Sequence, residues 1–132
     1  MQLWIGPTGA ATRVDGGLES TWGGGVQLVR VREGASLAVA GASLGAAHYA
    51  SRDAGRLWLD GVVGTRRLGG WMLGLAAGPA LELDDRRHPR LGGAVAVWGF
   101  AGITPVVRVG VLNDTGAFVE IGASLGLPAL RW

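Results

Sequence analysis

Bulky apolar residues alternate with small or polar residues, with a period of two, along most of this chain. Across 71–83 the odd positions are mostly bulky and apolar, whereas the even positions are Met, Gly or Ala until Glu82. The segment 119–127 repeats this pattern, with Glu120 on its small-residue side. Successive side chains of a β-strand point to opposite faces, and helical periodicity is nearly absent here. The alternation therefore predicts an all-β fold.

Eight segments carry the pattern, and most approach the roughly 9–11 residues that a tilted strand needs to cross a bilayer. They are 2–12, 22–32, 35–50, 56–65, 71–83, 91–102, 105–113 and 117–127. The length of 132 residues favours one domain, 1–132, and about eight strands is the minimum for a closed transmembrane barrel. We predict a closed up-and-down antiparallel barrel of about eight strands that spans a membrane.

Turn residues suggest how neighbouring strands pair. Asp114-Thr115-Gly116 fits a three-residue hairpin loop with Gly in the left-handed position, which would pair Val111 with Val119. The same reasoning at 32–34 places Val29 opposite Leu37. The even-numbered connections look tight and the first, third and fifth look longer and charged, as in outer-membrane barrels with short periplasmic turns.

The period alone does not decide which face is inside. A soluble barrel turns its apolar face inward, whereas a membrane barrel turns it outward. The face opposite the bulky one is poor in polar groups, which is unfavourable for a surface exposed to water. We expect it to be the interior, with Gly and Ala opposite Trp58, Trp98 and Phe100; its small or apolar residues include Ala38, Ala40, Ala42, Leu44, Ala46, Ala94 and Ala96.

Six charged residues fall on that same face, and buried charges are tolerated when they are paired and hydrogen-bonded. We expect a packed ionic plug formed by Arg30, Arg56, Asp60, Glu82, Arg108 and Glu120. In the register expected above, Glu120 lies one diagonal step from Arg108. On the uninterrupted apolar face, the residues expected to contact lipid are Leu73, Leu75, Val97, Val109, Ile121 and Leu125.

Composition argues against several other classes of protein. Twelve arginines, no lysines and a net charge of +2 are scattered without a stripe, so no nucleic-acid partner is expected. The absence of Cys removes disulfides, thiolate metal sites and Cys nucleophiles. The chain contains no apolar run of 18 residues, so no membrane-spanning helix is predicted. No signal peptide begins at Met1, so we expect the sequence to start at the mature form of an exported protein.

These features resemble the small outer-membrane β-barrel proteins of Gram-negative bacteria. Trp132 ends the chain on an aromatic residue, as the last strand of such barrels commonly does. The stretch His88-Pro89-Arg90-Leu91-Gly92-Gly93, continuing through 97–105 to 118–122, is similar to the C-terminal barrel portion of uncharacterised myxobacterial proteins. The resemblance implies an outer-membrane location and a barrel architecture, and it carries over no activity and no functional residues.

A lipid-modifying enzyme would need a nucleophile and a base on one surface. His48 and Ser51 are three residues apart on a strand and would face opposite sides. His88 lies in a charged loop, where a solvated His is ordinary, and Asp84-Asp85 beside it favours a charged loop over a surface cation site. We expect no catalytic residue, no cofactor and no metal; the candidate residues for catalysis are Ser43, His48, Ser51, Glu82, Asp84 and His88.

The expected function is a non-enzymatic, porin-like, monomeric outer-membrane barrel whose lumen is plugged by side chains. It would anchor or present its short loops, with membrane lipid as its partner and no small-molecule substrate identified. Two alternatives remain open at this point. One is a soluble β-barrel or sandwich that binds an apolar ligand, and the other is a lipid-modifying outer-membrane enzyme.

Overall fold

The computed structural model describes residues 1–14, 16–32, 34–84, 88–113 and 116–132. Their strands are β1 (Gln2–Val14), β2 (Gly17–Val31), β3 (Leu37–Tyr49), β4 (Ala54–Thr65), β5 (Met72–Asp84), β6 (His88–Phe100), β7 (Thr104–Leu112), β8 (Gly116–Ser124) and β9 (Leu127–Arg131). No helix in the described part of the chain is long and apolar enough to cross a membrane.

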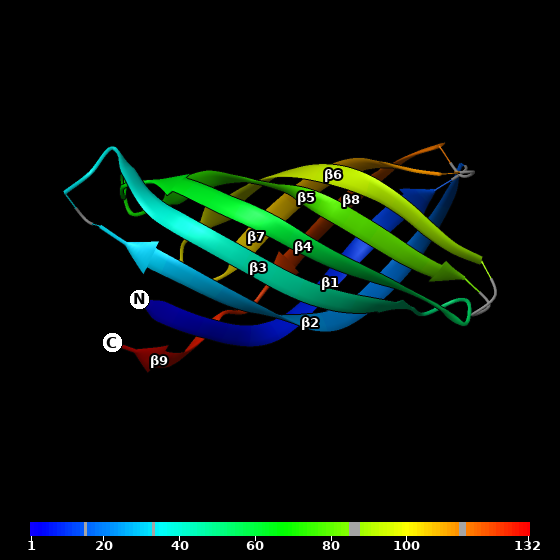
Figure 1. Cartoon of the computed structure of the whole chain (residues 1–132), viewed down its shortest axis with the longest axis horizontal. Coiled ribbons are helices and arrows are strands. Elements are labelled where there is room, and N and C mark those ends of the chain that lie inside the picture. The colour runs from blue at the N-terminus through cyan, green and yellow to red at the C-terminus, as the bar shows by residue number, and fades with distance from the viewer. Residues whose placement is uncertain (15, 33, 85–87, 114–115) are drawn as a thin grey trace.

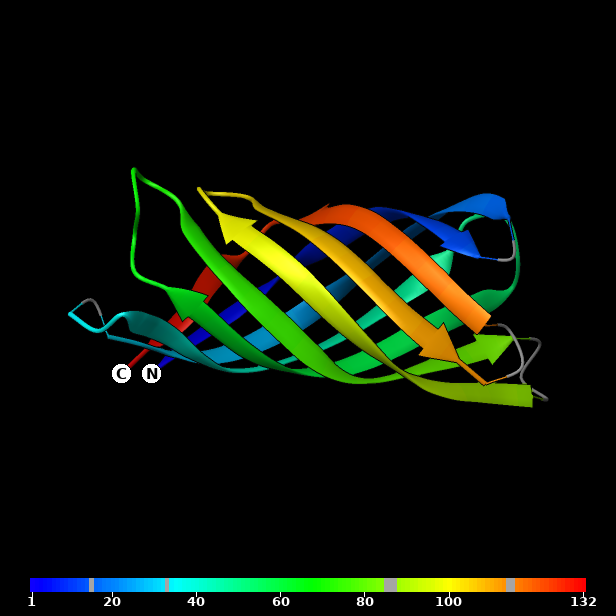
Figure 2. The ribbon, with the colours of Figure 1, turned by 90° about the horizontal axis from the view of Figure 1, so that it is seen from above.

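The strands form a closed antiparallel barrel of eight strands. From β2 to β8 each strand pairs with the next in sequence, and β1 pairs with both β2 and β8. Figures 1 and 2 show the strands wrapped around one long axis, with both chain ends at the same end of the barrel. The closed up-and-down barrel expected from the two-residue period is thus confirmed.

A ninth strand extends the last barrel strand along β1. The segment predicted as one strand, 117–127, divides into β8 and β9 around Leu125 and Gly126. The backbone of Leu125 crosses Gly6 so closely that a Cβ on Gly6 would meet the Leu125 carbonyl oxygen. Beyond this crossing β9 pairs with the beginning of β1, and the Met1 amine donates to the Trp132 carbonyl at 2.6 Å.

The barrel has two different ends. We call the end with the β1–β2, β3–β4, β5–β6 and β7–β8 connections the turn end, and the end with both chain termini the terminal end (Figure 1). The prediction of a long first connection over 13–21 is wrong, because β1 and β2 stay paired up to Val14 and Gly17. The predicted alternation of short and long connections is therefore absent, since the β4–β5 connection at the terminal end spans 66–71.

Two expected registers also differ from the structure. Val111 pairs with Ala117 rather than Val119, because Gly116, in the left-handed region with φ 78°, already pairs with Leu112. The loop therefore includes Asn113, and its residues 114–115 lie outside the described chain.

On the other side of the barrel, Val29 pairs with Gly41 rather than Leu37. Residues 32–36 separate β2 from β3, and Glu33 within them is outside the described residues. A bulge between Leu37 and Val39 then buries both Ala38 and Val39, so the odd residues of β3 face inward from there. The expected inward placement of Ala40, Ala42, Leu44 and Ala46 is therefore wrong.

Glycines make room for the large rings inside the barrel. Gly45 pairs across strands with Trp58, and Gly74 pairs with Trp98. A Cβ at either glycine would lie about 2 Å from the facing indole ring: 2.1 Å for Gly45 and 2.2 Å for Gly74. A narrow eight-stranded barrel has room only for packed interior side chains, so the small residues compensate for the rings. This follows the expected pairing of small with aromatic residues.

Candidate functional site

Inward-facing positions of four strands, β4, β5, β7 and β8, bring charged residues together inside the barrel. Five of the six residues predicted for the ionic plug lie there, and each is at most 6% exposed: Arg56, Asp60, Glu82, Arg108 and Glu120. We call these five residues, with Thr12 and Tyr49, the ionic layer. The side chains come from β1, β3, β4, β5, β7 and β8, so the layer crosses the lumen from one wall to the other.

Arg30, the sixth residue predicted for the plug, does not belong to it. The hairpin that pairs Val14 with Gly17 also pairs the inward Thr12 with Glu19, so the odd residues of β2 face inward. Val29 is accordingly buried and Arg30 is exposed on the outside. The prediction failed because the expected pairing of Val29 with Leu37 placed Val29 on the outer apolar face.

Arg56 is the central cation of the layer. Its Nη1 lies 3.0 Å from Oε2 of Glu120, and its Nη2 lies 3.0 Å from Oε2 of Glu82. The guanidinium carbon also lies 3.9 Å from the centroid of the Phe118 ring, a cation–π contact. Since Arg56 is 1% exposed, its charge is compensated by these protein groups rather than by bulk water.

Two uncharged hydroxyls complete the pairing of the glutamates. Thr12 donates its hydroxyl hydrogen to Oε2 of Glu120 at 2.9 Å, and Tyr49 donates to Oε2 of Glu82 at 2.8 Å. The Tyr49 oxygen in turn accepts a hydrogen bond from Arg56. Sequence reasoning missed both residues. Thr12 is an even residue of β1, whose even residues face inward, and could have been found. Tyr49 was missed because the even rather than the odd residues of 35–50 were predicted to face inward.

Arg108 connects the layer across the barrel to Asp60 on β4. It donates a short, charge-assisted hydrogen bond from Nη2 to Oδ2 of Asp60 and lies over the Trp58 ring, 4.7 Å from its centroid. Glu120, directly opposite Arg108 in the β7–β8 register, is farther away, with 3.8 Å between Nη1 and Oε1. The expected diagonal partner is thus a direct neighbour, but the closest partner is Asp60.

These distances predict which of the two carboxylates, Asp60 or Glu120, is coupled more strongly to Arg108. In double-mutant cycles of Arg108→Met with Asp60→Asn or Glu120→Gln, we expect coupling of roughly 0.5–3 kcal/mol, larger for Asp60. The reason is that, of these two carboxylates, Asp60 accepts a hydrogen bond from Arg108, whereas Glu120 lies 3.8 Å away. Urea titration of the refolded barrel measures each free energy of unfolding. Coupling to Glu120 that equals or exceeds coupling to Asp60 would contradict this arrangement.

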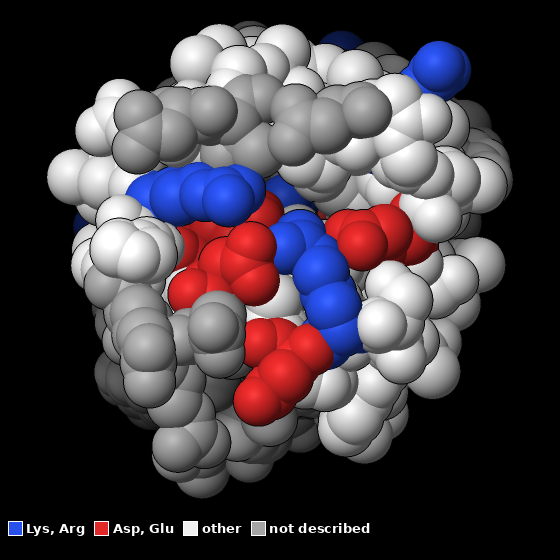
Figure 3. Space-filling view, turned by 90° about the vertical axis from the view of Figure 1, so that its right-hand side faces the viewer, with Lys and Arg blue, Asp and Glu red and all other residues white. Residues whose placement is uncertain are grey.

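A second set of ion pairs continues the layer to the turn end. Arg52 contacts Glu19, Asp84 and Glu82, with N···O distances of 3.1, 3.0 and 3.1 Å. Arg90 lies 3.4 Å from Asp84. We call Glu19, Arg52, Asp84 and Arg90 the mouth cluster, and Figure 3 shows acidic and basic side chains interleaved over the centre of this end. Glu82 touches both Arg52 and Arg56, so the mouth cluster and the ionic layer form one connected network.

The lumen is not filled at the terminal end. A cavity of about 800 Å³ runs from Asp60 and Arg108 in the ionic layer to Gln2, Arg66 and Arg131 at the terminal end. We call this the lumen cavity. Its aromatic lining comes from Trp4, Trp58, Trp98 and Phe100. The described part of the barrel therefore has an ion-paired half and a hollow half.

The outer surface carries large apolar side chains from every strand of the barrel. One exposed example from each of β1 to β8 is Ile5, Leu28, Leu44, Leu59, Leu75, Val97, Val109 and Ile121. All six residues predicted to contact lipid lie on this outer surface and are between 44% and 62% exposed. Exposed tryptophans occur at both ends of the apolar band, with Trp22 towards the turn end and Trp71 and Trp132 at the terminal end.

The residues weighed for catalysis lie apart. His48 is exposed, with its ring 5.9 Å from that of Trp22, whereas Ser43 on the same strand is buried inside the barrel. Ser51 donates a hydrogen bond to Glu19, and Glu82 and Asp84 are engaged by arginines. Among the described residues, no group of three or more His, Asp or Glu could hold a metal ion. Asp85, weighed beside His88 for a cation site, is outside the described chain.

Comparison with known proteins identifies the fold. No protein-family model matches the chain, and no curated protein matches it. A de novo designed transmembrane β-barrel is 15% identical, with a TM-score of 0.55 over 96% of this chain and 95% of that one. Ail, the attachment invasion locus protein of Yersinia pestis, is 12% identical, with a TM-score of 0.44 over 96% and 97%. The resemblance of 88–122 to myxobacterial proteins stays a prediction.

Proposed function

We propose that this chain spans a bacterial outer membrane as a monomeric, non-enzymatic barrel that is closed by its ionic layer. In this proposal the barrel anchors itself in lipid and presents the short connections of its turn end. The Gram-negative location and the lipid partner belong to the same proposal. It agrees with the closed-barrel fold shared with a designed transmembrane β-barrel.

The polarity of the two faces carries the proposal. Monomeric soluble proteins rarely expose apolar patches larger than a few hundred Å², yet large apolar side chains here cover the outside of all eight barrel strands. The charged side chains of β4 to β8 are meanwhile turned inward and paired. Membrane barrels also place aromatic residues at both membrane interfaces, where the exposed tryptophans of this band would lie. This arrangement suits lipid outside and a sealed polar interior.

Membrane extraction tests the location. Expressed with an export signal in a Gram-negative host, the protein should stay with the outer-membrane fraction after a carbonate wash and need detergent to dissolve. The folded barrel should migrate faster on a gel than the boiled chain. A folded protein that remains in the soluble fraction without detergent would refute membrane insertion and favour the soluble-barrel alternative.

Electrical recording tests the closed lumen. We expect purified protein in planar bilayers to show no stable, reproducible large channels, because the ionic layer and mouth cluster cross a lumen already narrow at eight strands. The matched variant is Arg56→Ala with Arg52→Ala, which removes two arginines that contact Glu82, where the layer meets the mouth cluster. This variant should conduct more often than the parent protein. Large channels from the parent monomer would overturn the closed barrel and favour a pore function.

The soluble-barrel alternative is favoured by one observation, the lumen cavity. Its volume of about 800 Å³ lies in the range of small-molecule sites, about 300–1,000 Å³. A soluble carrier would, however, have to expose the apolar outer band to water. The extraction experiment separates the two proposals without reference to any ligand.

A further inference from the structure

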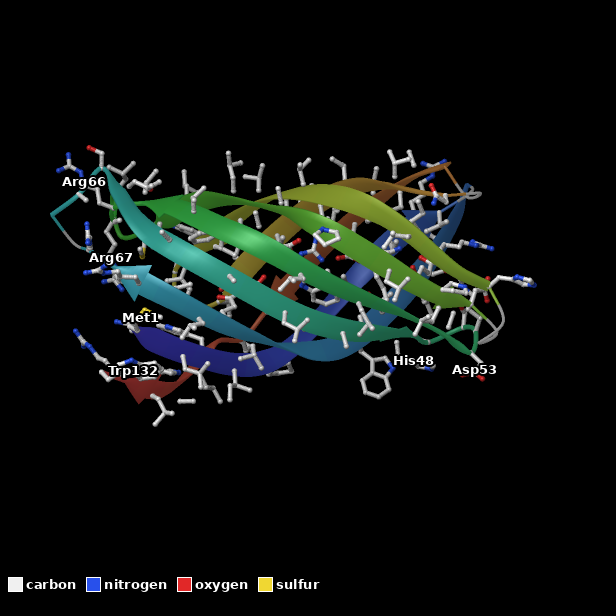
Figure 4. The ribbon with its side chains drawn as sticks, in the orientation of Figure 1. Met1, His48, Asp53, Arg66, Arg67 and Trp132 are labelled. Atoms are coloured by element: carbon white, nitrogen blue, oxygen red, sulfur yellow. The ribbon has the colours of Figure 1, made fainter. Side chains whose placement is uncertain are left out.

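The described arginines in and around the lumen fall into two groups. Those inside the lumen and at its mouth are paired with carboxylates: Arg52, Arg56, Arg90 and Arg108. Arg66, Arg67 and Arg131 line the other end of the lumen cavity, and the described residues place no carboxylate within salt-bridge distance of them. We call these three the rim arginines. Figure 4 shows Arg66 and Arg67 at the terminal end, where Met1 and Trp132 also lie.

Apolar walls follow inward from the rim. The Trp4 and Phe100 rings meet edge to face, with their centroids 5.5 Å apart. Deeper in the barrel, Trp98 and Val106 pack against Val62, Ala76 and Ala96. All of these side chains line the lumen cavity.

The floor of the cavity is formed by the ionic layer, part of which is covered by an aromatic ring. Trp58 lines the cavity and lies over the Arg108 guanidinium. From the rim inward, the cavity is therefore cationic, then apolar and aromatic, and finally closed by paired charges. A small-molecule site typically combines such apolar walls with a few polar groups that fix the ligand's orientation.

We propose that the lumen cavity binds one long-chain carboxylate, with its alkyl chain between the aromatic walls and its headgroup at the rim arginines. An alkyl chain gains free energy by leaving water for the apolar walls. A carboxylate would supply an acceptor for the guanidinium groups of the rim arginines. Arginine binds this planar anion through paired hydrogen bonds. This inference goes beyond the proposed function and requires only the folded barrel, whether in a membrane or in solution.

The probes are three amphiphiles of equal chain length: dodecanoate, dodecanol and dodecyltrimethylammonium. Native mass spectrometry of the full chain, folded and released from polyoxyethylene detergent, counts bound molecules at increasing probe concentration. We expect one dodecanoate per chain, bound about tenfold more tightly than dodecanol, as exposed ion pairs of modest strength imply. The cationic probe should bind most weakly.

The decisive variant is Arg66→Gln/Arg67→Gln/Arg131→Gln. It should bind dodecanoate no more tightly than dodecanol, whereas dodecanol binding stays unchanged. The matched control is Arg13→Gln/Arg30→Gln/Arg32→Gln, which removes the same charge from exposed arginines outside the cavity lining and should keep the preference.

A filling variant, Ala96→Phe, tests the cavity itself, because Ala96 lies on its wall. It should lose both dodecanoate and dodecanol. If this variant does not fold, the rim variant and its control still decide the proposal. Equal binding of all three probes, or a carboxylate preference that survives in the rim variant, would overturn it. Such a failure leaves the extraction result untouched, so the two proposals fail separately.

Discussion

Replacing Arg56 with methionine is expected to destabilise the folded barrel by about 3–5 kcal/mol. Arg56 lies between Glu82 and Glu120, and its removal leaves these two buried carboxylates without the cation that they share. Tyr49 would lose a donor at the same time. Urea titration of the lipid-refolded barrel measures the free energy of unfolding of the variant and of the parent, and their difference is this loss of stability.

Two companion variants separate lost pairing from lost packing. Arg30→Met removes an exposed arginine on the outer face and should change the stability by no more than about 0.5 kcal/mol. The triple variant Arg56→Met/Glu82→Gln/Glu120→Gln removes the central cation together with both of its acids. It should cost less than the sum of the three single changes, since no uncompensated charge remains. A small effect of Arg56→Met alone would mean that water reaches the ionic layer.

Placing arginine on the apolar band should hinder insertion into lipid. Leu75→Arg and Val109→Arg each put a charge where the outer surface is apolar, at positions 57% and 44% exposed. The expected cost is about 2–4 kcal/mol near mid-bilayer. The measurement is the refolding yield and stability in lipid vesicles, with the folded fraction read from the heat-modifiable gel band.

Leu18→Arg is the matched control, because Leu18 is equally apolar and 76% exposed but lies beside the first connection at the turn end. A charge near the membrane interface costs about 0–1 kcal/mol. Leu18→Arg should therefore refold close to the parent yield. Wild-type yields for both Leu75→Arg and Val109→Arg would show that the band does not contact lipid.

The alternation was sufficient to predict the barrel, but the facing of two strands required the registers of their hairpins. In β4, β5, β7 and β8, one side is clearly bulky, and the charged residues assigned to the interior do lie there. Segments 22–32 and 35–50 carry apolar or small residues on both sides, so composition did not distinguish the faces. In β2 the pairing of Val14 with Gly17 determined the inward face, and in β3 the bulge between Leu37 and Val39 determined it.

Contacts across the lumen were beyond sequence reasoning for a different reason. Register arguments relate neighbours on adjacent strands, whereas Arg108 reaches Asp60 and Arg56 reaches Glu120 from strands that do not pair. Such contacts depend on the diameter of the closed barrel and the lengths of the side chains. The lumen cavity likewise depends on where the aromatic rings point, which the period of two leaves open.

β1 occupies a special position in assembly, because it is the strand to which β2, β8 and β9 all attach. Its pairing with β2 is local, but its pairing with β8 joins residues more than a hundred positions apart, such as Thr12 and Glu120. Forming so distant a contact carries the loop-closure entropy of nearly the whole chain, and topologies rich in such contacts fold slowly. Closure is therefore expected to be the late, rate-limiting step. Until it occurs, β1 and β8 each present a free edge, so a delayed partner strand is the point at which this chain is most exposed to mispairing with another copy.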